Sequence, residues 1–365
     1  MKQGLTLVEM AQQIQDQASK KRDYIADTRQ IEMNSDGSLT VQAETVEDFE
    51  TTDHTHSQIA QRLSIPAKYY SRMRQEAPNL LADNVNHWFQ ANPEPRMIRT
   101  LEGKARAFLS NRYRRVDNMA IAETVLPVLK EFGDGLQIAS IGLTESRLYI
   151  KVVNQRLQLD VTVGDPVQAG VIVSNSEIGL GSIRIEPLVY RLICENGMAV
   201  PDRGMKKYHV GRALDNDEEA YEIFTDETKE AEDKALLLKV RDMVKAATSE
   251  ALFAQIVDQM RDATERKIEG NPVKAVEVLA DKFSMNQPEQ SSVLTHLIQG
   301  GDLSAYGLLN AVTRTSQDLP DYDRATEFEV MGSQVLALPQ STWKDVSSTL
   351  ENGLGQCFEP FVIEI

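Results

Sequence analysis

The sequence predicts an α+β fold in which a mixed, mostly antiparallel sheet region is followed by an acidic helical domain. Between about residues 96 and 200, apolar side chains recur with the period of two that is typical of strands. After Gly211 they recur at the three- and four-residue spacing of amphipathic helices. We therefore expect an N-terminal helix and hairpin in residues 1–55, a central α+β domain in 56–211, the acidic helical domain in 212–335 and a C-terminal strand or tail in 336–365.

Local signals define the first elements. Thr6 and Glu9 have the spacing of a capping box, which predicts a helix from Leu7 onward. Residues 31–33 and 39–41 alternate around Asp36-Gly37, a pair that is typical of a tight turn between two strands.

Residues 56–76 predict two short helices. Ile59 and Leu63 lie on one apolar stripe, and Pro66 suits the first turn of the second helix. The order of residues 58–66 resembles the first helix and turn of a helix-turn-helix. Its second helix would present Lys68, Tyr69, Arg72 and Arg74. Short helix pairs are common, so a plain helical hairpin is the interpretation that the sequence favours.

Further along the chain, strand periodicity in residues 147–153, 157–163 and 183–188 surrounds one helix near 119–132. In the helical region, Asn271-Pro272 is typical of a helix start, and Gly300-Gly301 of a helix end.

The charge of the chain is unevenly distributed. The 365 residues carry a formal net charge of −16, but residues 1–210 hold 25 basic and 26 acidic side chains, and residues 211–365 hold 14 and 29. The acidity therefore belongs to the helical region, and the low isoelectric point does not exclude nucleic-acid binding by the first 210 residues. The two cysteines, Cys194 and Cys357, exclude a disulfide scaffold. With no membrane span and no signal peptide in the sequence, we expect a cytoplasmic protein.

Residues 95–115 carry the strongest local signal, seven basic side chains against one acidic side chain, Glu102. A turn at Glu102-Gly103 would pair two strands, with Lys104, Arg106 and Phe108 on one face and Ala105, Ala107 and Leu109 on the other. Cations bind phosphates and aromatic rings stack on bases, so this pattern suits a nucleic-acid strand. The candidate nucleic-acid-binding residues are Arg96, Arg99, Lys104, Arg106, Phe108, Arg112, Tyr113, Arg114, Arg115, Lys206 and Lys207. The alternative is that several of these arginines pair with the acidic C-terminal domain.

Other motifs are weaker. The glycines of residues 174–182 lack the spacing of a phosphate-binding loop. The apolar neighbours of Cys194 predict that it is a buried structural thiol. His54 and His56 would share one side of a strand, but no further metal ligands cluster with them. The acidic residues between 318 and 327 fit helix caps and solvated faces. We expect no metal, no cofactor and no catalytic residues.

Residues 107–118, 174–179, 190–198 and 309–314 form four further segments of note. They resemble a known family, the phage- and plasmid-related proteins that carry domain of unknown function 932, and the resemblance covers about residues 55–335. It implies a bacterial cytoplasmic setting and a role in the DNA metabolism of a mobile element. It supplies no catalytic residues.

The combined expectation is a non-enzymatic nucleic-acid-binding protein that binds single-stranded DNA, promotes annealing or recombination, and self-associates through its basic and acidic surfaces. A second hypothesis is an anti-defence or regulatory protein whose acidic helices bind a host protein. A nuclease that uses the acidic residues near 318–327 is the third.

Overall fold

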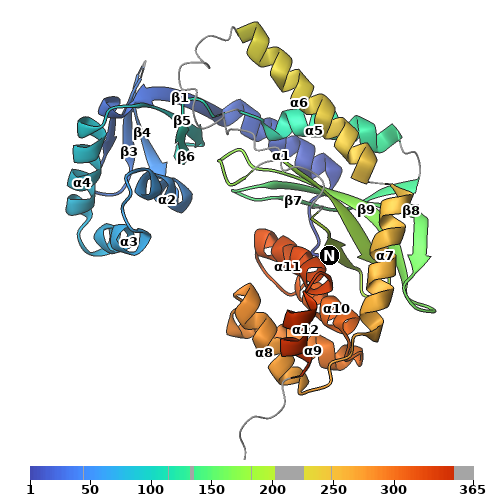
Figure 1. Ribbon diagram of the computed structural model, residues 1–365. Coiled ribbons are helices and arrows are strands. Elements are labelled where there is room, and N and C mark those ends of the chain that lie inside the picture. Colours follow the sequence, from blue (N-terminus) through green and yellow to red (C-terminus); the bar gives the residue numbers. More distant parts are fainter. Residues whose placement is uncertain are drawn as a thin grey trace, which may run out of the picture.

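The computed structural model describes residues 1–43, 45–113, 115–131, 135–181, 183–201, 226–247 and 249–348. It confirms the α+β class: two sheets and a set of helices form the protein (Figure 1). In Figure 1 the first sheet and three helices form one lobe, and the second sheet and the remaining helices form the other. Among the described residues, no helix combines the length and the apolar character that crossing a lipid bilayer requires.

The N-terminal unit is built on a six-stranded sheet in the order β1-β5-β6-β4-β3-β2. The strands are β1 (Lys21–Asp27), β2 (Ile31–Met33), β3 (Leu39–Gln42), β4 (Val46–Thr51), β5 (Pro95–Leu101) and β6 (Lys104–Ser110), and the short 3-10 helix η1 (Thr28–Gln30) joins β1 to β2. All neighbours are antiparallel except β4 and β6. Both predicted hairpins are present, β2–β3 and β5–β6. The sheet therefore crosses the expected division at residue 55, because strands from either side of it are neighbours.

Three helices, α2 (Asp53–Arg62), α3 (Ala67–Glu76) and α4 (Pro78–Ala91), pack their apolar residues on one face of this sheet. Tyr24 of β1 and Phe49 of β4 have ring centroids 5.3 Å apart although two strands separate β1 from β4. The sheet is therefore strongly curved, and the helices fill its apolar side.

A bulge in β6 changes the predicted alternation. The register shifts between Arg99 and Thr100, whose partners are Ala107 and Ala105, so Arg106 has no partner of its own. Ala105 and Phe108 consequently share the core with the helices, while Ala107 and Leu109 pack on the opposite face. The expectation that Phe108 shares a face with Lys104 and Arg106 is wrong because of this one extra residue.

The second sheet is fully antiparallel, in the order β11-β10-β9-β8-β7. Its strands are β7 (Leu136–Leu143), β8 (Leu148–Asp160), β9 (Pro166–Asn175), β10 (Arg184–Arg191) and β11 (Asn196–Ala199). One face is covered by α1 (Leu7–Lys20), α5 (Asn118–Glu131) and α6 (Asp226–Ala247). The capping box predicted for Thr6 and Glu9 opens α1.

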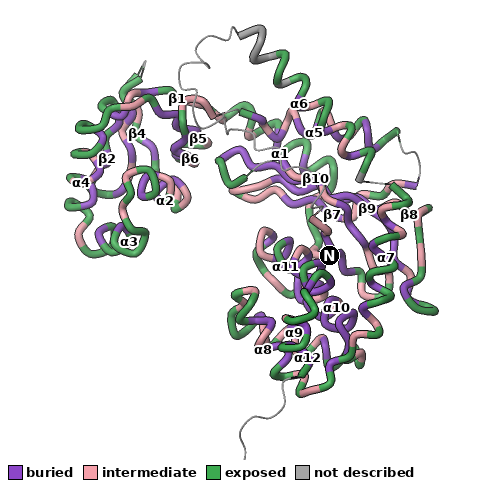
Figure 2. The backbone as a smooth tube through the Cα atoms, in the orientation of Figure 1, coloured by how far each residue is buried: buried purple, intermediate pink, exposed green. Residues whose placement is uncertain are grey.

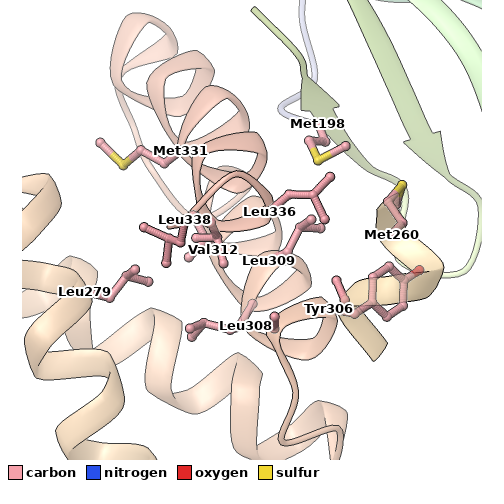
Figure 3. Packing of buried hydrophobic residues seen from close by; sticks show 14 of the residues in the cluster. Met198, Met260, Leu279, Tyr306, Leu308, Leu309, Val312, Met331, Leu336 and Leu338 are labelled. Carbon is pink, nitrogen blue, oxygen red and sulfur yellow. The ribbon is translucent and has the colours of Figure 1, made fainter. Parts of the chain in front are cut away.

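On its other face this sheet shares one core with the later helices, part of which is shown in Figure 3. They are α7 (Glu250–Glu265), α8 (Pro272–Phe283), α9 (Gln287–Gly300), α10 (Ala305–Thr315), α11 (Tyr322–Leu336) and α12 (Gln340–Ser347). Asn271 caps α8, and Gly301 ends α9 in the left-handed conformation, as predicted. Residues 340–347 are helical, so the strand or tail expected from residue 336 onward is wrong there, and residues 349–365 lie outside the described part. Figure 2 shows buried backbone running through the sheet and these helices alike.

An ion pair without solvent access joins the second sheet to α11. Lys151 of β8 and Glu329 are both 0% exposed, and Lys151 Nζ lies 2.8 Å from Glu329 Oε2. Lys151 Nζ also donates to Thr326 at 3.0 Å and lies 4.6 Å from the centroid of the Tyr322 ring. A charge this deeply buried is stable only while its partner is present.

We expect Lys151→Met to lower the free energy of unfolding by about 3–5 kcal/mol, because Glu329 is left buried without its cation. Urea unfolding followed by circular dichroism measures the loss. The double variant Lys151→Met/Glu329→Leu should recover most of it. A double variant that is as unstable as the single variant would contradict this account.

Candidate nucleic-acid interface

Three of the predicted binding residues are buried. Arg99 is 2% exposed, Arg96 9% and Phe108 3%. Arg96 donates from Nε and Nη2 to Glu94 at 2.9 and 2.7 Å, and Phe108 stacks on Phe89 with ring centroids 5.5 Å apart. Buried side chains cannot contact a nucleic acid, so Arg96, Arg99 and Phe108 do not belong to the interface that the sequence predicted.

Arg99 is the cationic centre of a buried ionic network between the two sheets. Its Nε donates to Asp23 of β1 at 2.9 Å, and its Nη2 donates to Asp117, next to α5, at 2.7 Å. Its Nη1 donates to the backbone oxygen of Glu177 at 2.8 Å. Burial alone would lower the pKa of Arg99, but the two carboxylates outweigh it and raise that pKa. The same pairing holds the pKa of Asp117 below 3.8 despite its burial.

Glu177, on the loop after β9, is the anionic centre of this network. Its carboxylate accepts from Lys21 at 3.0 Å, from Arg106 at 3.4 Å and from the backbone N–H of Asn118 at 2.8 Å. The side chain is 3% exposed. We call these six residues the junction network: Lys21, Asp23, Arg99, Arg106, Asp117 and Glu177. Its three cations and three anions balance, and it connects β1, β5 and β6 to the second sheet.

The loop that carries Glu177 also packs on apolar surface. Ile178 joins Met97, Ala107 and Leu109 in a small buried cluster. Its backbone oxygen accepts from Nε2 of His54 at 2.8 Å and from Gln58 at 2.9 Å. Gly179 has φ +80°, and a Cβ there would lie 2.6 Å from Leu109 Cδ2. Glycine is therefore required for the loop to approach β6 this closely, which explains part of the glycine pattern of residues 174–182.

The alternative left open by the sequence was that the arginines of residues 95–115 pair with the acidic helices. Arg96, Arg99 and Arg106 are paired, but their carboxylates come from Asp23, Glu94, Asp117 and Glu177. The first 177 residues thus supply these counterions. Lys21, Asp23 and Glu177 were not predicted from the sequence, because nothing in their local pattern shows that they contact residues 70 or more positions away.

The remaining predicted residues lie at or near the surface. Lys104 and Arg115 have side chains 54% and 53% exposed, and their nearest carboxylates are Glu50 at 4.0 Å and Asp23 at 3.5 Å. Arg112 is half-buried. Tyr113 packs against the apolar cluster of the junction and donates its hydroxyl to Ser176 at 3.3 Å. Arg114, Lys206 and Lys207 lie outside the described residues.

A cleft of about 600 Å³ lies between the lobes, and it is not a basic groove. Lys104, Arg106 and His54 line it, but so do Glu50, Asp53, Glu102 and Glu145. Carboxylates outnumber the cations, so this cleft does not favour a phosphate backbone. Residues 110–117 connect β6 to α5, and we call them the crossing segment.

The motifs proposed for metals or catalysis have other partners. His54 and His56 lie on helix α2 and not on a strand. Asp321 caps α11, Asp323 accepts from Thr144, and Asp318 accepts from His296 at 2.6 Å. Within the described residues, no group of three or more His, Cys, Asp and Glu side chains could hold a metal ion.

Cys194 is half-buried and not fully buried as predicted. It lines a cavity of about 750 Å³ where Arg191 donates to its Sγ at 3.3 Å, while the same guanidinium pairs with Asp165 at 2.7 Å. The Arg191 charge is thus neutralised within the protein.

The helix pair predicted for residues 56–76 is present as α2 and α3. His56 of α2 is 3% exposed, and its Nδ1 lies 2.9 Å from the hydroxyl of Tyr70 on α3. Burial, with a smaller contribution from Arg74, lowers the pKa of His56 from 6.5 to about 4, and Asp53 offsets only part of this effect. The ring is therefore neutral at physiological pH and fixes the contact between the two helices.

The protein is therefore an α+β protein of two lobes that are joined by a buried ionic network. Residues 107–320, more than half of the chain, match the family described as "Domain of unknown function (DUF932)", and the chain belongs to this family. The matched region begins in β6, includes Asp117 and Glu177 and ends after α10. No curated protein and no solved structure matches the chain.

We expect Glu177→Gln to destabilise the contact between the lobes by about 3 kcal/mol, because a neutral amide leaves Arg106 without its anion and leaves Lys21 with Asp117 alone, at 3.0 Å. Urea unfolding measures the change, and limited proteolysis within residues 110–117 should become faster. Glu145→Gln, at an exposed position, is the matched control and should change little. Equal stability of the two variants would show that the network does not hold the lobes together.

We also expect acid to destabilise the N-terminal unit before carboxylates titrate. The unfolded chain takes up a proton at His56 near pH 6.5, whereas the folded chain keeps the ring neutral down to a pKa of about 4. Stability is thus complete above pH 6.5 and falls by up to about 3 kcal/mol as the pH drops to 4. Urea unfolding of His56→Gln should not show this loss of unfolding free energy between pH 6.5 and 4. The control His87→Gln, at an exposed site, should still show it. Parallel pH profiles for wild type and His56→Gln would refute the assignment.

Proposed function

We propose that this protein binds nucleic acid through its N-terminal unit, single-stranded DNA in the first place. The supporting observation is the exposed positive charge at the junction. The junction network balances its own charges, so the exposed Arg115 and Lys104 and the half-buried Arg112 are not needed to neutralise a buried carboxylate. Asp23, the carboxylate nearest to Arg115, already pairs with Arg99 at the shorter distance of 2.9 Å. Exposed, weakly paired cations can exchange such partners for phosphates at little cost.

The geometry changes the expected character of this binding. Phe108 is in the core, and the Tyr113 ring packs against the junction cluster, so the two aromatic rings proposed to stack on bases are both engaged within the protein. Without stacking, affinity rests on phosphate contacts, which are independent of sequence and sensitive to salt. This profile suits a protein that coats or anneals strands. A setting in the bacterial cytoplasm and a role in the DNA metabolism of a mobile element belong to the same proposal.

Self-association would follow from the charge asymmetry. Residues 211–365 carry 29 acidic and 14 basic side chains, and the cations of the crossing segment lie on the other lobe. Basic and acidic surfaces of neighbouring copies can therefore pair along a strand. Mass measurement in solution with and without an oligonucleotide tests this step, and a monomer under both conditions would remove it.

We expect labelled single-stranded DNA to raise the fluorescence anisotropy on binding, with an affinity that falls as salt increases. Arg112→Glu/Arg115→Glu should weaken binding about tenfold and leave the thermal midpoint unchanged, because neither side chain is in the core. Lys274→Glu/Lys282→Glu on the exposed face of α8 makes the same charge change elsewhere and should bind normally. No wild-type binding at low salt, or equal binding by the two double variants, would overturn the proposal.

The second candidate is a protein partner for the acidic helices. Exposed acidic side chains follow α7, namely Glu250, Asp258, Asp262 and Glu265. Such a surface attracts a basic partner and resembles a phosphate backbone in charge. Failure of the wild-type protein to bind DNA of any form at low salt would favour this function.

A further inference from the structure

The turn between α2 and α3 has the geometry of a DNA-binding motif. Only residues 63–66 connect the helices, and Ser64 lies in the left-handed region with φ +56°. The N–H of Leu63 donates to Ile59 at 3.0 Å and that of Ile65 to Ala60 at 2.9 Å, so the chain closes α2 and reverses at once. A turn of three to four residues between two short helices is one feature of the helix-turn-helix.

The buried residues of this pair have the matching pattern. Ile59 and Ala60 of α2 are 0% and 3% exposed, and Tyr70 and Met73 of α3 are 3% and 2% exposed. The His56–Tyr70 contact adds a polar link between the two helices. One face of α3 is therefore fixed against α2 and the core, and the opposite face points to solvent.

The outward face of α3 is basic and polar. The exposed side chains of α3 are Ala67, Lys68, Tyr69, Ser71, Arg72, Arg74, Gln75 and Glu76. Residues 61–76 contain four basic side chains and one acidic side chain, Glu76. Arg62 pairs with Glu94, and Arg74 pairs with Asp53 at 2.6 Å. Arg72 pairs with Glu76 at 2.8 Å, but both side chains are more than 60% exposed, and a pair this exposed contributes little. The backbone N–H groups at the start of α3 also lack a side-chain cap, since Pro66 precedes it.

The position of α3 leaves this face accessible. In the view of Figure 1, α3 lies at an outer end of the N-terminal lobe, away from the second sheet. Charge on this lobe is segregated, because residues 31–51 hold six acidic and no basic side chains. The electrostatic field of the lobe therefore favours the approach of a polyanion at α3 over its approach at the acidic strands.

We propose that α3 is a recognition helix that enters the major groove of duplex DNA, with α2 across the sugar-phosphate backbone. Lys68 and Arg72 bind phosphates or guanine edges, and Ser71 and Gln75 lie where a recognition helix contacts bases. This inference rests on the proposed function in placing DNA on the N-terminal unit. It uses a different surface from the crossing segment, so the two can fail separately.

The test compares a labelled 30-base-pair duplex of mixed sequence with a 30-nucleotide single strand, across a salt series. Lys68→Glu/Arg72→Glu should weaken duplex binding about tenfold and lower the slope of log affinity against log salt by about 2, as two lost phosphate contacts require. Binding of the single strand should stay within about twofold of wild type, because Arg112 and Arg115 are intact. Lys274→Glu/Lys282→Glu is the matched control.

The milder variant Lys68→Gln/Arg72→Gln removes charge without reversing it and should give a smaller loss in the same direction. Arg72→Lys retains the charge but not the bidentate geometry, so it should reduce preference among duplexes selected from a random pool more than it reduces affinity. Duplex binding that survives Lys68→Glu/Arg72→Glu unchanged, or wild-type protein that binds single strands but no duplex at low salt, would overturn the recognition helix. The second outcome would leave the proposed function in place.

Discussion

The carboxylate of Glu177 is the interaction on which the arrangement of the two lobes depends. It accepts from a lysine of β1, an arginine of β6 and a backbone N–H at the start of α5, while the carbonyl of the same residue accepts from Arg99. Desolvating one such charge is costly, and the cost is offset only when every partner is in place. The network therefore selects a single docking of the first sheet on the second, which the apolar cluster around Ile178 alone would specify less sharply.

The elements that local rules define were predictable from the sequence. The Thr6 cap and the Asn271 helix start each depend on residues within four positions of one another, and the hairpin at Asp36-Gly37 depends on residues 31–41. The faces of β6 were not predictable, because strict alternation fails when one extra residue enters the strand. That single insertion moves Phe108 from a supposed binding face into the core. Nothing in the spacing of residues 104–109 distinguishes the bulged strand from a regular one.

The candidate interface shows a second limit, which concerns charge. A run of arginines has the same composition whether it binds phosphates or balances buried carboxylates. Arg99 and Arg115 lie 16 positions apart, yet one is 2% exposed and the other has a side chain 53% exposed. The difference depends on Asp23 and Glu177, which lie 76 and 78 positions from Arg99 in the chain. Counting charges along the sequence cannot separate these roles, because neutralisation is a property of contacts between distant segments.

The net charge of the whole chain, or of one lobe, likewise does not show where the exposed charges lie. The whole chain is strongly acidic, yet residues 21–118 contain 14 basic and 14 acidic side chains. Six of those acidic side chains lie in residues 31–51, which hold no basic side chain, and exposed cations lie on α3, in the crossing segment and at Lys104. A lobe with no net charge but separated charges has an electrostatic potential that differs from face to face. A polyanion is attracted to the positive face at short range. The His56–Tyr70 contact fixes the position of α3, and the junction network fixes the attachment of the crossing segment. Buried polar contacts therefore fix the positions of two sets of surface cations on one lobe. Some basic residues stabilise the fold, and others are available for binding.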